Sequence, residues 1–123
     1  MTEALATHLL LELWGVDEAL LNDERALEAH LLAAAAAARC EVLGSVRHRF
    51  HPQGASVVVL VAESHLSVHT WPEHRYASVD ILTCGATLPE AGVACLIERF
   101  RPERHEVQRL ARGLVRPALR QIP

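Results

Sequence analysis

Several features of common protein classes are missing from this sequence. Its apolar runs, such as residues 33–38 and 57–62, are far shorter than the ~18 residues that a membrane-spanning helix requires. The stretch MTEALATHLLLELWG at the start has neither the basic leader nor the cleavage site of a secretory signal. We therefore expect no membrane segment and a cytoplasmic location.

Basic residues are not in excess either. The chain has 12 basic and 15 acidic residues, which give a net charge of −3, whereas electrostatic binding to nucleic acid needs a basic face. Its cysteines, Cys40, Cys84 and Cys95, are odd in number and include no CxxC pair. This pattern indicates reduced thiols and argues against a disulfide framework, a zinc ribbon or a redox pair.

What is present is the composition of an ordinary globular domain. Of the 123 residues, 50% are hydrophobic and 22% are charged, which argues against wholesale disorder and predicts a single domain over residues 1–123. A domain of this size leaves much surface for its volume, so oligomerisation would add burial.

Periodicity predicts two helices and six strands. Apolar spacing favours a helix over residues 17–39, with Asn22 or Asp23 capping its main part, and Pro89 opens a second helix that continues to Phe100. The predicted strands lie at 8–14, 40–50, 56–62, 64–70, 76–83 and 105–110, followed by a loose tail after Gly113. This order favours an α+β fold: a two-layer α/β sandwich with a mainly antiparallel sheet and two helices packed on one face.

The most unusual segment is ESHLSVHTWPE at residues 63–73. By strand parity, His65, Ser67 and His69 share one face, which is either exposed to solvent or turned into a site. A metal site of His65, His69 and His74 is one interpretation, but its spacing fits no closed ligand pattern.

Ser64 within this segment admits two further interpretations. A serine hydrolase is one, but no GxSxG elbow is present, and the neighbouring Ser64 and His65 project to opposite faces. The other is an internal acyl shift, in which the Ser64 hydroxyl attacks the preceding peptide bond.

An ordered set of motifs around this segment decides between these interpretations. They are HRF at 48–50, PQG at 52–54, Ser56, AESHLSVHTWPE at 62–73 and DILTCG at 80–85, with HLLLELWG near the start and Arg112-Gly113 agreeing more weakly. With these motifs, the run from His48 to Gly85 resembles prokaryotic S-adenosylmethionine decarboxylase proenzymes. Such an ordered match is far more specific than a short motif.

The resemblance implies a proenzyme that cuts itself between Glu63 and Ser64. The products would be a β chain of residues 1–63 and an α chain of residues 64–123, and the scissile bond is expected to carry backbone strain. Ser64 would become a pyruvoyl group, which forms a Schiff base with the substrate. Neither pyridoxal phosphate nor a metal is then expected.

The resemblance also assigns the surrounding groups. Ser56 matches the hydrogen-bond donor to the tetrahedral intermediate of processing, and His69 matches the group that transfers a proton in the elimination. Cys84 matches the proton donor in decarboxylation. By the same match, Phe50 stacks on the adenine, with His69 on its other side, and Glu73 binds the ribose hydroxyls.

The implied reaction converts S-adenosylmethionine into S-adenosylmethioninamine and CO2 for polyamine synthesis. Because the family works as paired protomers, we expect a dimer of αβ heterodimers. Two alternatives stay open: the same pyruvoyl chemistry on ornithine or arginine, and an unprocessed, non-catalytic relative that binds a nucleoside. Phe50 and Glu73 argue against ornithine and arginine, because a substrate without adenosine needs neither.

A few residues depart from the family pattern or have no assigned role. Val57 stands where the family commonly has glycine. Trp71 is expected in the core or at an interface, Glu12 is expected to be a charge at a sheet edge, and Cys40 and Cys95 are expected in the core.

Overall fold

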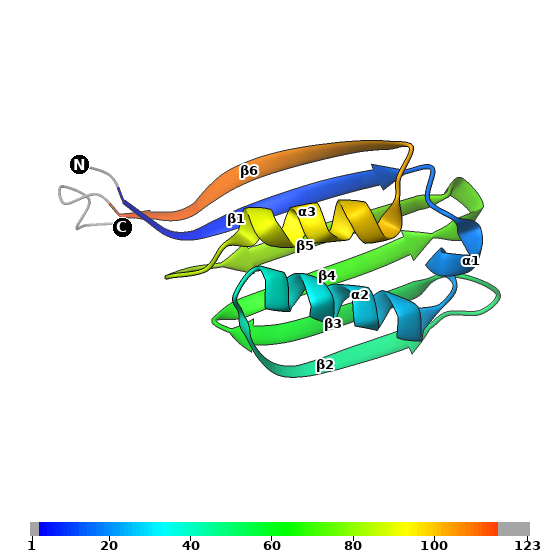
Figure 1. The fold of residues 1–123 in the computed structure, drawn as a ribbon, viewed down its shortest axis with the longest axis horizontal. Helices are drawn as coiled ribbons and strands as arrows, with labels where there is room; N and C mark the ends of the chain where they lie inside the picture. The colour runs from blue at the N-terminus through cyan, green and yellow to red at the C-terminus, as the bar shows by residue number, and fades with distance from the viewer. Residues whose placement is uncertain (1–2, 116–123) are drawn as a thin grey trace, which may run out of the picture.

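Within residues 3–115, which the computed structural model describes, six strands form one antiparallel sheet, and two long helices cover one of its faces (Figure 1). In spatial order the strands are β2 (Glu41–Arg49), β3 (Ala55–Ala62), β4 (Ser64–Trp71), β5 (Tyr76–Thr83), β1 (Glu3–Trp14) and β6 (Arg104–Val115). The helices are α1 (Glu18–Leu21), α2 (Glu24–Ala37) and α3 (Pro89–Phe100), with a 3-10 turn, η1 (Pro72–His74), after β4. The predicted α+β two-layer sandwich is confirmed.

The helix predicted over residues 17–39 is divided into α1 and α2 at Asn22 and Asp23, and the predicted cap of its main part is confirmed at Asp23. Asp23 caps α2, because its carboxylate accepts a hydrogen bond from an amide of the first turn at 3.0 Å. The Asn22 side chain accepts a hydrogen bond from the Gly54 amide at 2.9 Å, which ties the helix layer to the turn between β2 and β3. None of the helices within residues 3–115 has the length and apolar character needed to cross a membrane.

Alternation along the strands separates a helix-covered face from an open face. In β3, Val57 and Val59 are buried, whereas Ser56 and Val58 point to the open face. Val57 therefore lies on the face opposite Ser56. The side chain that departs from the family pattern fills the core and does not crowd the Ser56 hydroxyl.

The core between the sheet and the helices is apolar. Leu27 of α2 and Leu96 of α3 are fully buried, and Phe100 at the end of α3 is 2% exposed. Full burial of such a side chain contributes about 1.5–3 kcal/mol. Cys40 and Cys95 pack against this core and are partly buried.

The two edge strands, β2 and β6, are exposed on both faces, because the helices lie over the middle of the sheet (Figure 1). Strand β6 pairs with β1 along its whole length, so the last strand is longer than the predicted 105–110. The tail expected to be loose after Gly113 is strand up to Val115, and residues 116–123 lie outside the described part of the chain.

Thr70 on β4 joins the sheet to the helix layer. Its hydroxyl donates to the Leu21 carbonyl at 2.7 Å and accepts from the Ala55 amide at 2.9 Å, and the residue is 8% exposed. One buried hydroxyl thus holds the end of β4 against β3 and α1.

Replacing Thr70 with valine should lower the free energy of unfolding by about 1–3 kcal/mol, because the Leu21 carbonyl and the Ala55 amide lose a buried partner. Thr70→Ser keeps the hydroxyl and should lose less. Urea denaturation of both variants measures the difference. Equal stability of Thr70→Val and the unaltered protein would contradict this role.

Candidate active site

Strand β4 presents alternate polar side chains to the open face. His65 and Ser67 hydrogen-bond to Asp80 on β5, and His69 hydrogen-bonds to Ser56 on β3. These contacts are possible because β4 lies between β3 and β5. The predicted common face of His65, Ser67 and His69 is confirmed, and it is the face without helices.

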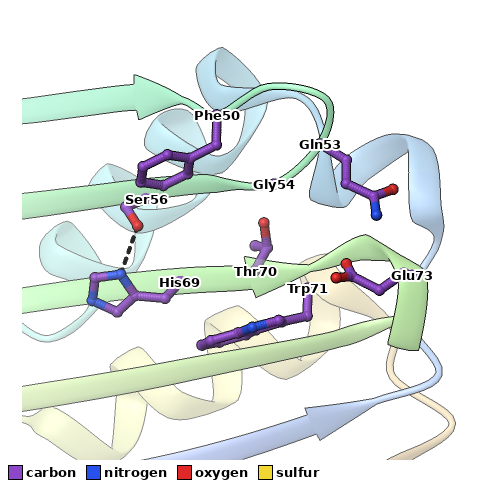
Figure 2. A pocket seen from close by; sticks show the side chains of 8 residues that line it. All are labelled: Phe50, Gln53, Gly54, Ser56, His69, Thr70, Trp71 and Glu73. Atoms are coloured by element: carbon purple, nitrogen blue, oxygen red, sulfur yellow. Dashed lines mark hydrogen bonds between the residues drawn. The ribbon is translucent and has the colours of Figure 1, made fainter.

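Four residues singled out in the sequence gather at one end of this face: Phe50, Ser56, His69 and Glu73, which we call the His69 group (Figure 2). Ser56 and His69 are cross-strand partners, and Ser56 Oγ lies 2.7 Å from His69 Nδ1. The group lines a hollow of about 360 Å³. A volume of this order is typical of small-ligand sites.

Trp71 lines the same hollow and so does not lie in the core, which was one of the two places expected for it. The residue is 42% exposed, and its ring lies across the hollow from Phe50 (Figure 2). Phe50 is itself 46% exposed and packs edge-on against His48, with 4.7 Å between ring centres. A signal for Trp71 was available, because it continues the two-residue alternation of His69 and therefore shares its face.

Glu63, Ser64 and Cys84, which we call the Ser64 group, lie at the other end of β4. The pairing of His65 with Leu82 brings the start of β4 beside the end of β5, and Cys84 follows that end. Cys84 Sγ lies 3.0 Å from Glu63 Oε1 and 4.0 Å from the Glu63 carbonyl oxygen. The thiol is therefore next to the peptide bond for which the sequence predicts cleavage.

The backbone at Ser64 is strained, as we expect for the bond at which cleavage is predicted. Its φ of 126° lies in a region that glycine adopts readily and residues with a Cβ avoid. Such a conformation costs of order 1–3 kcal/mol and persists only where the surroundings enforce it.

The Glu63 carboxylate raises the pKa of the Cys84 thiol. The largest contribution comes from the hydrogen bond that the thiol donates to this carboxylate. Burial and the negative charge of Glu63 also raise the pKa of the thiol. All three causes favour the neutral form. The thiol is therefore kept protonated at neutral pH.

Within one chain, the Ser64 group and the His69 group are far apart. Ser64 and His69 are five positions apart on β4, which at about 3.4 Å per residue corresponds to roughly 17 Å. By the resemblance to the family, both groups are expected in a single site. One copy of the chain does not bring them together.

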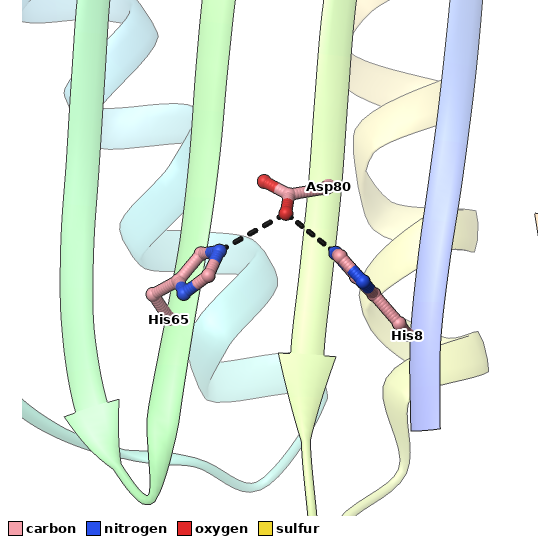
Figure 3. A group of neighbouring side chains, drawn as sticks. All are labelled: His8, His65 and Asp80. Carbon is pink, nitrogen blue, oxygen red and sulfur yellow. Dashed lines mark hydrogen bonds and ion pairs between the residues drawn. The ribbon is translucent and has the colours of Figure 1, made fainter. Parts of the chain in front are cut away.

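A third polar cluster, which was not predicted from the sequence, lies around Asp80 (Figure 3). Asp80 accepts hydrogen bonds from His8 Nε2 at 2.7 Å, from His65 Nε2 at 3.0 Å and from the Ser67 hydroxyl. Burial alone would raise the pKa of Asp80, but these hydrogen bonds outweigh it and lower the pKa. On its other side, His8 Nδ1 accepts a hydrogen bond from Arg112 at 2.7 Å.

Pairing between distant strands explains why this cluster was missed. His8 and Asp80 are 72 positions apart and meet only because β1 pairs with β5.

The metal site considered for His65, His69 and His74 is not formed. Among the described residues, ligand spacing that suits a metal ion occurs instead at His8, His65 and Asp80.

Glu12 was expected at a sheet edge, but β1 lies between β5 and β6, so this expectation is wrong. Its carboxylate accepts a hydrogen bond from the Tyr76 hydroxyl. The Tyr76 ring packs against Trp14 at 4.3 Å and Trp71 at 5.4 Å between ring centres. A row of aromatic side chains therefore extends from the His69 group across three strands.

Comparison with known proteins identifies the family. The family model for S-adenosylmethionine decarboxylase matches residues 7–113. S-adenosylmethionine decarboxylase proenzyme 2 of Bacillus cereus is 43% identical over 108 residues, which cover 87% of this chain and 88% of the relative. The proenzyme of Methanococcus maripaludis is 38% identical over 112 residues, 90% of this chain and 92% of the relative. The crystal structure of the adenosylmethionine decarboxylase from Aquifex aeolicus has a TM-score of 0.87 and 35% identity, and the match covers 97% of this chain and 99% of that chain. The chain therefore belongs to the S-adenosylmethionine decarboxylase family.

Proposed function

We propose that this protein decarboxylates S-adenosylmethionine to S-adenosylmethioninamine and CO2, supplying the aminopropyl donor for polyamine synthesis, after it has cut itself at Ser64. Membership of the family supports the reaction and its class, a carboxy-lyase. The observation that carries the proposal is the geometry at Ser64. This serine has a strained backbone, and the peptide bond before it lies beside the Cys84 thiol.

Self-cleavage begins at the Ser64 hydroxyl. Its oxygen attacks the carbonyl carbon of Glu63, its proton passes to the leaving nitrogen, and the C–N bond breaks as an ester forms. Loss of the Ser64 Cα proton then breaks the Cβ–O bond of this ester, expels the new main-chain carboxylate of Glu63 and leaves dehydroalanine. Water hydrolyses this residue to the pyruvoyl group and ammonia. Cleavage releases the strain at Ser64, of order 1–3 kcal/mol, which favours the first step.

The residues present fit a cofactor that the chain makes from itself. The 123 residues include no lysine, which is the side chain that holds pyridoxal phosphate in its enzymes. A pyruvoyl group supplies the electron sink that loss of a carboxyl group from an amino acid requires.

A second copy of the chain would unite the Ser64 group with the His69 group. A two-fold axis near the middle of β4, close to Ser67, would place the Ser64 end of one copy over the His69 end of the other. Because a two-fold contact repeats itself, it would complete two sites at once. We therefore propose that each site takes Ser64 and Cys84 from one copy and the His69 group from the other.

The open face has a surface suited to this contact. Val46, Val58 and Leu60 are 72%, 39% and 53% exposed. Val46 pairs with Val58, and Leu60 follows two positions later in β3, so the three side chains share the open face. Packing two open faces would bury these apolar side chains on both copies.

Ser56 and His69 would assist processing in such a site. The Ser56 hydroxyl can donate to the oxygen of the tetrahedral intermediate, and the imidazole of His69 can move the proton that the elimination releases. Their hydrogen bond of 2.7 Å orients the ring.

Phe50 and Glu73 would bind the nucleoside part of the substrate. Phe50 offers an exposed aromatic face to the adenine, and the Glu73 carboxylate can accept from both ribose hydroxyls. Trp71 lines the same hollow. A free amino acid such as ornithine or arginine has no ring to stack on Phe50.

Cys84 would protonate the substrate carbon after CO2 has left. A proton donor must hold its proton at working pH, and the raised pKa of the Cys84 thiol meets this requirement.

Intact mass spectrometry should find two fragments, residues 1–63 and 64–123, with the second blocked at its amino terminus. The same sample should release CO2 from carboxyl-labelled S-adenosylmethionine and not from ornithine or arginine. Ser64→Ala should abolish both cleavage and CO2 release, whereas Ser45→Ala on the edge strand β2 should change neither. An uncut chain that releases no CO2 would refute the proposed function.

Mixing two inactive variants tests whether the site is shared between copies. Ser64→Ala and His69→Ala should each stay uncut alone, because each lacks one group. When the two are co-expressed, mixed dimers contain one complete site, and only the His69→Ala chain should be cut. If no chain is cut in the mixture while each variant forms dimers, both groups act within one copy.

Alkylation of Cys84 tests the effect of Glu63 on its pKa. In the uncut Ser64→Ala background, Glu63→Gln removes the negative charge and weakens the hydrogen bond, so the pKa of Cys84 should fall. Iodoacetamide should then label the Cys84 peptide at lower pH, because the thiolate is the reactive form. Cys40, whose pKa burial raises, is the internal control and should not change. An unchanged pH profile at Cys84 would contradict the assigned contact.

A further inference from the structure

A chain of hydrogen bonds crosses four strands and ends at the residue after Ser64. Arg112 on β6 donates to His8 Nδ1 on β1 at 2.7 Å, and His8 Nε2 donates to Asp80 on β5 at 2.7 Å. His65 on β4 donates to the same carboxylate oxygen at 3.0 Å (Figure 3). None of these four side chains has a part in the chemistry proposed above.

Three of the four resemble a metal site, but Arg112 argues against one. The ligand atoms of His8, His65 and Asp80 lie within 4.8 Å of one another, as in a site of two histidines and one carboxylate. A guanidinium can only donate, so His8 Nδ1 must accept and Nε2 of the neutral ring carries the hydrogen. This leaves no lone pair at Nε2 for a metal, and the arginine adds a positive charge beside it.

We propose that Arg112, His8, Asp80 and His65 form a clamp that holds Ser64 in its strained conformation for self-cleavage. The inference rests on the proposed function, because it concerns the efficiency of the proposed cut. The four are positioning residues. Asp80 accepts hydrogen bonds from His8, His65 and Ser67. Because His65 directly follows Ser64 in the chain, Asp80 acts on Ser64 through His65.

The strain at Ser64 requires that the residues on both sides be held, since a backbone free to move would relax. On one side, the His65 backbone pairs with both neighbouring strands and its side chain is tied to Asp80. On the other side, the Glu63 carboxylate is held by the Cys84 thiol at 3.0 Å. Ser64 therefore lies between two anchored neighbours.

Asp80 is a firm anchor for His65. It lies on β5, which is paired with β4 and β1, and it accepts from three side chains on these strands. Because these hydrogen bonds lower its pKa, the carboxylate stays an acceptor at neutral pH. By donating to His8 Nδ1, Arg112 also fixes the tautomer in which His8 Nε2 donates to Asp80.

Asp80→Asn should slow self-cleavage roughly 10-fold to 100-fold, the loss expected when strain of this order no longer favours the cut. Freshly translated protein is sampled over time and the cut fraction is measured by mass spectrometry. CO2 release per cut chain should fall less than the cleavage rate, since the strain is gone once the bond is broken. Glu106→Gln, an exposed carboxylate on β6, is the matched control and should be cut at the normal rate.

A stability cycle separates a clamp from a merely structural role. In uncut protein, Ser64→Gly should melt at a higher temperature than Ser64→Ala, because glycine tolerates the φ of this position. If Asp80 enforces the strain, Asp80→Asn should reduce the difference in melting temperature between Ser64→Gly and Ser64→Ala. An unchanged difference would overturn the clamp, even if Asp80→Asn lowers both melting temperatures. Should Asp80→Asn fail to fold, His65→Leu serves in the same cycle.

The outcomes for the clamp and for the proposed function are distinct. If the unaltered chain stays uncut, the proposed function fails. If it is cut and Asp80→Asn is cut at the same rate, only the clamp is refuted. One equivalent of Zn²⁺ bound by the unaltered protein and lost in His8→Gln would also refute the clamp, in favour of a metal site.

Discussion

The hydrogen-bond ladder of β4 is the constraint on which the rest of the structure depends. This strand is paired on both sides, with β3 and with β5. A slip by one residue would turn buried Leu66 out of the core, so the register is fixed by the burial of its apolar side chains. The same register sets His69 against Ser56, and it brings Ser64 to the end where β5 leads into Cys84.

Helices cover only one face of the sheet, and this asymmetry leaves the other face open. Polar side chains of the open face find partners in neighbouring strands, as Asp80 does with His8 and His65. Within residues 3–115, no buried side-chain nitrogen or oxygen lacks a hydrogen-bond partner. A half-buried carboxylate is therefore compatible with stability here, because its donors offset the loss of water.

Strand geometry places the Ser64 group and the His69 group at opposite ends of β4, so one copy would hold two halves of the proposed sites. In the proposed dimer, symmetry solves this problem, since a two-fold axis turns two half-sites per chain into two complete sites. The same contact would bury the apolar part of the open face, which a chain of 123 residues leaves uncovered. Assembly and catalysis would then depend on one surface.

Local patterns in the sequence sufficed for the elements, the sheet type and the polar face of β4, because strand parity and helix spacing are properties of neighbouring residues. The motifs around Ser64 were also enough to predict the family. The separate short helix α1, the position of Trp71 beside the His69 group and the cluster around Asp80 were not predicted, although parity alone could have placed Trp71. The separation of Ser64 from His69, and the meeting of His8 with Asp80 across 72 positions, were decided only by the tertiary structure. Strand order and register set which distant residues become neighbours, and they follow from packing of the whole core and not from any local segment.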